Sequence, residues 1–208
     1  MSAEKTATGS TSGAPTARQN QTMASGRKTG LIKKVLLTLG VLVVLFLGFV
    51  AAQPAEYRIT RSATIEAPPA EVFPQVNNLH NWQVWSPWAK LDPAAKNSFE
   101  GPPEGTGSIF KWSGNDQIGE GKMTIIESRP DELIRFKLEF MRPFEDTSTS
   151  EFTFQAKEDQ TVVTWSMSGH KNFMSKAMCL FMDMDKMLGG DFEKGLAQMK
   201  AVVEKPAN

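Results

Sequence analysis

Few side chains in this 208-residue sequence have the types and spacing that catalysis requires. His80 and His170 are possible general acids or bases, but neither lies in a pattern that supplies an orienting partner. Cys179 has no basic neighbour closer than Lys176, which favours an inert thiol over a nucleophile. One cysteine and two histidines are also too few soft ligands for a convincing zinc site. The sequence therefore shows no catalytic constellation and predicts neither a metal nor another cofactor.

Other common catalytic patterns are equally weak. Asp183 and Asp185 are two residues apart in a predicted helix, so their carboxylates point to different sides. The string Gly105-Thr106-Gly107 lacks the lysine and the helix start of a phosphate-binding loop. Enzymatic activity is left open, with a non-enzymatic function favoured.

The most informative cluster is aromatic. Trp82, Trp85 and Trp88 recur at a spacing of three. Indoles in this arrangement can cap a ligand pocket, where each N–H is able to bind a polar head group. They can equally form a hydrophobic plug that closes one end of a sheet. The sequence does not decide between the two interpretations.

The elements that must position these residues are mostly strands. Period-two alternation is clear from 132 to 140, where Ile134, Phe136, Leu138 and Phe140 oppose charged residues. The same criterion predicts strands over 57–65, 108–113, 119–128, 132–140, 147–157 and 161–169. Proline-rich and glycine-rich strings break the segment between Trp88 and Gly107.

Two helical regions complete the pattern. Pro69 suits the first turn of a helix that carries Val72 to Val76, and a short helical piece follows around Leu79 to Trp82. After Lys171, apolar residues recur every three or four positions, which predicts one long amphipathic helix. Gly189-Gly190 within it predicts a kink or close packing. The fold class is α+β, with a curved antiparallel sheet wrapped around the long C-terminal helix.

Residues on the inward side of this arrangement are the candidates for a ligand site. Most large apolar residues form a core in any fold, so they bind a ligand only if the packing leaves a cavity. The candidates are Trp85, Trp88, Phe110, Trp112, Met123, Phe136, Phe140 and Trp165, facing Met184, Met187 and Phe192. Arg61 and Arg142 could orient a carboxylate ligand, although a salt bridge at the rim is favoured.

The N-terminal part of the chain predicts a membrane segment. Residues 1–30 hold no large aliphatic or aromatic side chain and are expected to be a disordered tail. Residues 35–52 carry no charge and are apolar on all sides, and with Leu31, Ile32 and two lysines that can snorkel, residues 31–52 indicate a transmembrane helix. A cleaved signal peptide is the alternative, because small residues follow at 50–52, but the apolar stretch exceeds a typical signal core. Residues 53–208 then form one domain.

The charge distribution predicts topology. The chain has 23 basic and 23 acidic residues, but residues 1–34 hold six basic groups and one acidic group. Residues 53–208 hold 17 basic and 22 acidic groups, which disfavours nucleic acid as a partner. Basic residues before the span place the N-terminus in the cytoplasm and the domain outside, as a single-pass protein of the inner (plasma) membrane.

Three strings resemble a known superfamily. They are 65–73 (IEAPPAEVF), 81–88 (NWQVWSPW) and 182–196 (MDMDKMLGGDFEKGL). Together with the element order, they resemble the START-like helix-grip (SRPBCC) superfamily, in particular its polyketide cyclase/dehydrase-like subgroup with an N-terminal membrane anchor. The resemblance covers residues 57–203.

The resemblance implies a deep hydrophobic cavity between the sheet and the last helix, which binds lipids or other apolar small molecules. It does not imply catalysis. We therefore expect a membrane-anchored extracytoplasmic domain that binds a hydrophobic small molecule or lipid, with the membrane contacted through residues 31–52. The alternatives are a cyclase-like or hydrolase-like enzyme and an interaction module of a membrane complex.

Overall fold

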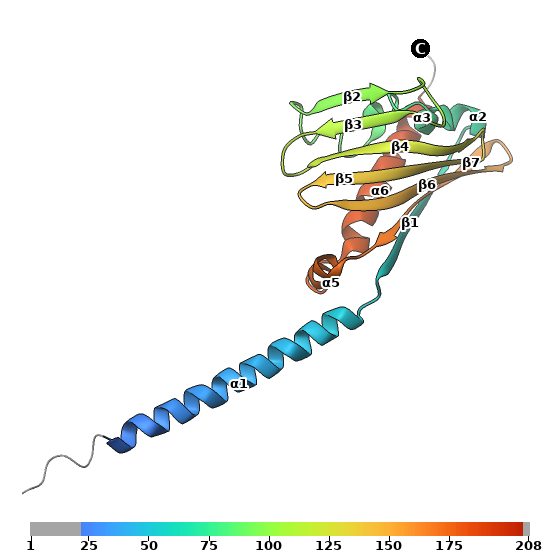
Figure 1. Ribbon diagram of the computed structural model, residues 1–208. Coiled ribbons are helices and arrows are strands. Elements are labelled where there is room, and N and C mark those ends of the chain that lie inside the picture. The colour runs from blue at the N-terminus through green and yellow to red at the C-terminus, as the bar shows by residue number, and fades with distance from the viewer. Residues whose placement is uncertain (1–21, 206–208) are drawn as a thin grey trace, which may run out of the picture. The chain divides into compact units, whose positions relative to one another are not determined.

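The computed structural model describes residues 22–205, and the side chains from residue 30 onward (Figure 1). It separates into two compact units, of which the first ends at Val50 and the second begins at Ala51. Residues 1–21 of the predicted disordered tail lie outside the described residues.

The first unit is dominated by α1, Thr22–Ala52, which begins before the predicted start of the span. Its segment Gly30–Ala52 has the length and composition to cross a membrane, and no second helix in the described residues does. At 23 residues it is about 35 Å long, against roughly 30 Å for the hydrocarbon core. Most of its large apolar side chains are exposed; Leu37, for example, is 71% exposed, whereas Val50 is buried.

The second unit is built on one seven-stranded antiparallel sheet in the order β1-β7-β6-β5-β4-β3-β2 (Figure 1). The strands are β1 Glu56–Ile65, β2 Lys96–Glu100, β3 Ile109–Ser113, β4 Glu120–Arg129, β5 Leu133–Arg142, β6 Asp146–Lys157 and β7 Gln160–His170. Six of them match the predicted strands. The sequence missed β2, because a five-residue edge strand that is mostly exposed carries no clear alternation.

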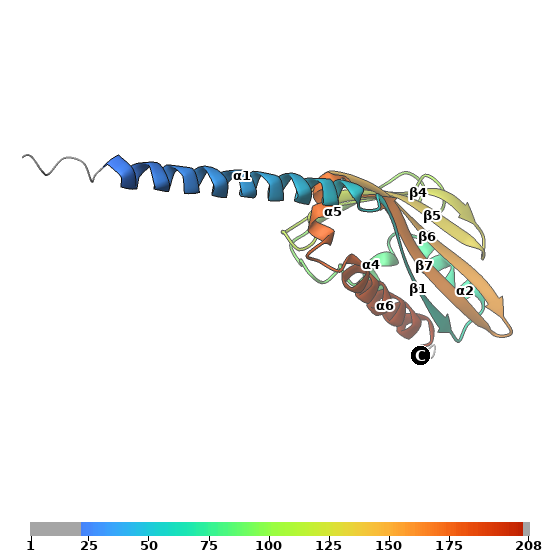
Figure 2. The same ribbon diagram turned by 90° about the horizontal axis from the view of Figure 1, so that it is seen from below.

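The sheet is curved, as predicted. The pairing of β4 with β5 shifts register between Glu120 and Gly121 and again between Ile125 and Glu127. Such bulges bend a strand and increase its twist. Figure 2 shows the strands arching over α4 (Trp82–Trp85) and α6 (Met184–Val203). This confirms the predicted α+β helix-grip fold.

The short helices between β1 and β2 differ in detail from the prediction. The helix expected from Pro69 is two single turns, α2 (Pro69–Val72) and α3 (Pro74–Asn77). Pro74 explains the break, because proline has no N–H to continue the helical ladder. The piece expected around Leu79 to Trp82 lies slightly later, as α4.

The predicted long C-terminal helix is present as α6, but it begins later than expected. The chain forms α5 (Phe173–Cys179) and α6, separated by residues 180–183. Asp183 caps α6, since its side chain accepts a hydrogen bond from the N–H of Lys186. The predicted close packing at Gly189 is present, because any side chain there would collide with the guanidinium of Arg61.

Candidate functional site: an apolar cavity beneath the sheet

An apolar cavity of about 220 Å³ lies between the sheet, α6 and the segment that follows α4. This volume exceeds the roughly 150 Å³ of a cavity that holds benzene and is below the roughly 300 Å³ at which drug-sized sites begin. Its lining comprises Trp82, Gln83, Ser86, Trp88, Ala89, Asp92, Ala95, Asn97, Phe110, Trp112, Gln117, Ile118, Met123, Phe136, Leu138, Phe140, Ser150, Trp165, Met167, Leu188 and Phe192.

Eight of the eleven predicted ligand-binding residues line this cavity. Alternation along β3, β4, β5 and β7 turns one side chain in two toward α6, which explains why most strand candidates meet there. They are Trp88, Phe110, Trp112, Met123, Phe136, Phe140, Trp165 and Phe192. From the helix side, Leu188 and Phe192 close the cavity, and Phe192 is 1% exposed.

The three tryptophans of the cluster have different positions. Trp82 and Trp88 line the cavity, and both rings meet the edge or face of Trp165 at centroid distances of 5.6 and 5.8 Å. Trp85 does not line it. Its ring is fully buried, and its Nε1 donates to the carbonyl of Gln75 at 2.9 Å. Trp85 is therefore part of the structural core, whereas Trp82 and Trp88 lie at the cavity.

Met184 and Met187 are also absent from the cavity. Met187 is 49% exposed, and Met184 lines a more open groove of about 590 Å³ with Tyr57 and Cys179. The cause is the late start of α6. Its first turn lies beside the edge strand β1, where Arg61 contacts Asp185, instead of beneath the central strands.

Most polar side chains of the cavity lie in the segment from α4 to β2. One more lies in the turn after β3 and another in β6. The amide of Asn97 donates to the Gln83 side chain at 3.4 Å, and Gln117 lies in the turn after β3. Ser150 is buried and accepts a hydrogen bond from Nε1 of Trp165 at 2.9 Å. Every buried side-chain N or O atom of the described residues has a partner. The interior thus offers an apolar surface with few polar contacts.

Asp92 is the one titratable residue of the cavity lining. Its carboxylate accepts hydrogen bonds from the N–H groups of Ala94 at 3.0 Å and Asn115 at 2.7 Å. These bonds tie the segment before β2 to the β3–β4 turn. Asp92 therefore positions the wall of the cavity and has no acid or base partner in the lining.

The sequence candidates for catalysis lie elsewhere. His80 is exposed and stacks on Phe99 with ring centroids 3.8 Å apart, and His170 is exposed at the end of β7. Cys179 is outside the cavity lining. The histidines and the cysteine are therefore not brought together at the cavity.

The two candidate arginines form salt bridges, as favoured from the sequence. Arg61 contacts Asp185 at 2.9 Å and Glu193 at 2.7 Å, and Arg142 contacts Glu120 at 3.1 Å. Hydrogen bonding to Arg61 lowers the pKa of the Asp185 carboxyl below its ordinary value. Neither arginine lines the cavity.

Sequence reasoning missed several residues of the cavity lining. Leu138 continues the alternation of β5 and could have been selected with its neighbours. Residues from the irregular segments had no periodic signal that would place them at a cavity. They are Ser86, Ala89, Asp92, Ala95, Gln117 and Ile118.

A curved antiparallel sheet that holds a long C-terminal helix over an apolar cavity defines the helix-grip class, the SRPBCC proteins, whose fold binds hydrophobic ligands. The chain belongs to one family of this class, described as polyketide cyclase / dehydrase and lipid transport, whose model matches residues 56–204. No curated protein matches the chain at a significant level.

Solved structures show the same fold. A protein from Mesorhizobium loti is 14% identical, with a TM-score of 0.54, and the match covers 73% of this chain and 100% of that one. A protein from Chromobacterium violaceum is 14% identical, with a TM-score of 0.52 and coverage of 74% and 100%. The Aha1 dimer from Colwellia psychrerythraea is 16% identical, with a TM-score of 0.52 and coverage of 71% and 96%.

Proposed function

We propose that this protein is a membrane-anchored, extracytoplasmic domain that binds a hydrophobic small molecule or lipid in the cavity beneath its sheet. The observation that carries the proposal is the apolar cavity of about 220 Å³, lined mainly by aromatic and aliphatic side chains from both the sheet and α6. A binding protein needs such a preformed volume with a few orienting polar groups. The lining supplies no pair of groups for acid–base chemistry, which supports binding over turnover.

The size of the cavity limits the ligand. It suits a fused pair of rings or a short acyl segment, and a larger lipid would place only part of its chain inside. The amides of Gln83, Asn97 and Gln117 are uncharged polar groups available to the ligand. The carboxylate of Asp92 beside them disfavours an anionic head group. We therefore infer a ligand that is apolar at one end and carries an uncharged polar group at the other.

The anchor is the segment Gly30–Ala52, which is long and apolar enough to span a bilayer. Arg18, Arg27 and Lys28 precede it and Lys33 and Lys34 lie at its start, whereas Arg58 and Arg61 are the nearest basic residues after it. This asymmetry supports a cytoplasmic N-terminus and an external domain. We infer an anchor over a cleaved signal because the apolar segment is longer than a typical signal core.

Ligand binding is tested with a matched pair of substitutions in the full-length protein. Leu138→Trp adds bulk inside the cavity, whereas Ile126→Trp adds the same bulk at a bulged, 47% exposed position of β4. Native mass spectrometry of each protein extracted from its own membrane measures copurifying ligand. Calorimetric titration with phenol, 2-naphthol and 1-hydroxypyrene then measures the size limit.

We expect wild type and Ile126→Trp to carry ligand and to bind 2-naphthol in preference to 1-hydroxypyrene. Leu138→Trp should lose copurifying ligand and bind 2-naphthol at least about tenfold more weakly, because the ring occupies the same volume. Equal binding by the two variants, or no ligand on wild type, would overturn the proposed site.

The anchor is tested separately. A C-terminal reporter that is active only outside the cytoplasm should be active, and the mass of the membrane-extracted protein should include residues 31–52. Reporter activity in the cytoplasm would reverse the orientation, and a mature protein that begins after Ala52 would establish a signal peptide instead.

A further inference from the structure

Exposed large hydrophobic residues of the second unit gather at one end of it. Eight of its eleven exposed large hydrophobic residues belong to the end of β5, to the β5–β6 turn, to α5, to the α5–α6 connection or to the first turn of α6. We call these eight residues the apolar rim; they are Met141, Phe144, Phe173, Met174, Met178, Phe181, Met182 and Met187. An apolar surface this concentrated indicates an interaction site, since isolated exposed residues are the norm.

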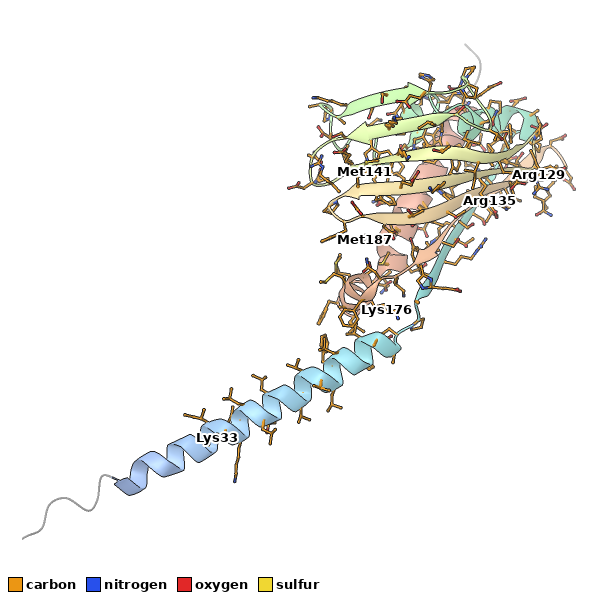
Figure 3. The ribbon with its side chains drawn as sticks, viewed as in Figure 1. Lys33, Arg129, Arg135, Met141, Lys176 and Met187 are labelled. Carbon is orange, nitrogen blue, oxygen red and sulfur yellow. The ribbon has the colours of Figure 1, made fainter. Side chains whose placement is uncertain are left out.

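The strand register places the apolar rim at the end of the sheet where β1 begins. Glu56 pairs with His170, directly before α5, and Gly169 pairs with Ser148, just after the β5–β6 turn. At the opposite end of β4 lies Arg129, far from Met141 (Figure 3). Figure 3 marks Met141, Met187 and Lys176 along the side on which the β5–β6 turn and α5 lie.

The chain connects this end directly to the apolar helix. The apolar segment ends at Ala52 and β1 begins at Glu56, so three residues lie between them and their Cα atoms are at most about 14 Å apart. Within the second unit, the N–H of Lys171 donates to the carbonyl of Ala55 at 2.6 Å. The Nζ of Lys176 donates to the carbonyl of Ala51 at 3.1 Å. Within the second unit, these hydrogen bonds hold the start of α5 beside Ala51 and Ala55.

Exposure along the apolar rim is high. Phe181 is 80% exposed, which is more than the 71% of Leu37 in the apolar helix itself. Met174 is 61% exposed and Met178, one helical turn later, is 42% exposed, so α5 presents an apolar face. Moving side chains of this kind from water to the boundary between head groups and acyl chains is favourable, because it removes apolar surface from water.

We propose that the apolar rim inserts into the outer surface of the bilayer that residues 30–52 span, so that α5 lies in the membrane interface. This inference rests on the proposed anchor but not on the ligand site. The short connection keeps the apolar rim at the bilayer surface. The bilayer is therefore the one partner that the covalent connection itself brings next to the apolar rim. Acidic residues Glu145, Asp146 and Asp183 are interspersed with Lys171 and Lys186, so the contact is apolar and does not require anionic lipid.

The inference is tested on the full-length protein in phosphatidylcholine vesicles, in a Cys179→Ser background. An environment-sensitive fluorophore is attached to one introduced cysteine at a time, at Phe181→Cys or Met174→Cys in the apolar rim. Ile126→Cys is the control in the domain, and Val43→Cys reports on the span. Quenching by nitroxide groups carried on the lipid chains measures contact with the bilayer.

We expect blue-shifted emission and severalfold stronger lipid quenching at positions 174 and 181 than at 126, and the same result when phosphatidylglycerol is added. Strong quenching at 43 with none at 174 and 181 would overturn the interfacial contact while the anchor stands. No quenching at 43 would overturn the anchor, and the inference with it. Blue-shifted emission at 181 without lipid quenching would show that a protein surface covers the rim, and would also overturn the inference.

Discussion

The indole ring of Trp165 on β7 and the phenyl ring of Phe192 on α6 lie parallel, with centroids 4.0 Å apart and an angle of 8° between their planes. Both side chains are almost fully buried, and both line the cavity. The same contact therefore fastens the helix to the sheet and forms one wall of the candidate site. Stability and cavity shape are coupled at this pair.

Removing the ring at position 192 should be costly. Phe192→Ala deletes a phenyl group that is 1% exposed and leaves an enlarged cavity, so the free energy of unfolding should fall by about 3–5 kcal/mol. Phe144→Ala removes the same ring from a 61% exposed position and should change it by less than about 0.5 kcal/mol. Urea denaturation of the full-length proteins in mild detergent measures both. Similar losses in the two variants would contradict the role assigned to Phe192.

Two glycines of α6 should respond in opposite directions to the same substitution. A Cβ on Gly195 would lie 2.9 Å from the Trp165 ring and 3.2 Å from Pro87, whereas a Cβ on Gly190 would have nothing within 4 Å. Gly195→Ala adds a methyl group to a tightly packed contact and should lower the free energy of unfolding by about 1–3 kcal/mol. The higher helix propensity of alanine offsets part of this loss. Gly190→Ala should raise it by up to about 1 kcal/mol.

Urea denaturation measures the change in the free energy of unfolding for both variants. Stabilisation by Gly195→Ala would mean that α6 can move away from the sheet, and the close packing at this point would not be required. Gly190→Ala also controls for the general effect of alanine on the helix, because it changes propensity without changing packing.

Much of the fold could be predicted because one face of most strands is buried. Phe136 and Leu138 on β5 alternate with charged residues, so the inward face was readable from residue order alone. The helix break before Asp183 could not be predicted, because Phe181 and Met184 keep helical spacing. Phe181 is nevertheless exposed in the connection, and Met184 is the first residue of α6. Periodicity reports which residues are apolar, and it does not report where a helix is capped.

The cavity was harder to predict than the fold. Trp85 and Trp88 are alike in sequence context, yet one is sealed in the core by a hydrogen bond to Gln75 and the other lines the cavity. The difference depends on how residues 86–95, which lack periodic structure, pack against the sheet. Unfilled volume is a property of that packing, and no pattern of residue types specifies it.

The ion pair between Arg61 and Asp185 predicts a loss of stability in acid. Hydrogen bonding to Arg61 lowers the pKa of Asp185 below the ordinary value of 3.8, so the contribution is fully present above that value. It is lost as the pH falls through the lower pKa of the folded state. Asp185→Asn should therefore be less stable than wild type at neutral pH and nearly equal to it in strong acid.

Urea denaturation across the acid range, with Arg61→Gln and the double variant, isolates the pair. Coupling between positions 61 and 185 should be present at neutral pH and should vanish once Asp185 is protonated. A coupling that does not change with pH would show that the two residues act through packing at Gly189 and not through charge.

Tyr57 predicts the opposite pH dependence. Burial raises the pKa of its phenol above the ordinary value of 10, although the hydrogen bond with Ser148, at 2.8 Å between the oxygens, partly offsets the effect. The unfolded chain therefore ionises first. The contribution of Tyr57 to stability is fully present below pH 10 and is lost as the pH rises through the higher pKa of the folded state.

Tyr57 is the sole tyrosine of the chain, so phenolate absorbance reports on it alone. We expect its titration midpoint above that of a free tyrosine in the folded protein and a further increase in Ser148→Ala, because the hydrogen bond that lowers the pKa is removed. Ser98→Ala, on the exposed edge strand β2, should leave the midpoint unchanged. A midpoint that falls in Ser148→Ala would show that Ser148 stabilises the neutral phenol, and the assigned role of the bond would be wrong.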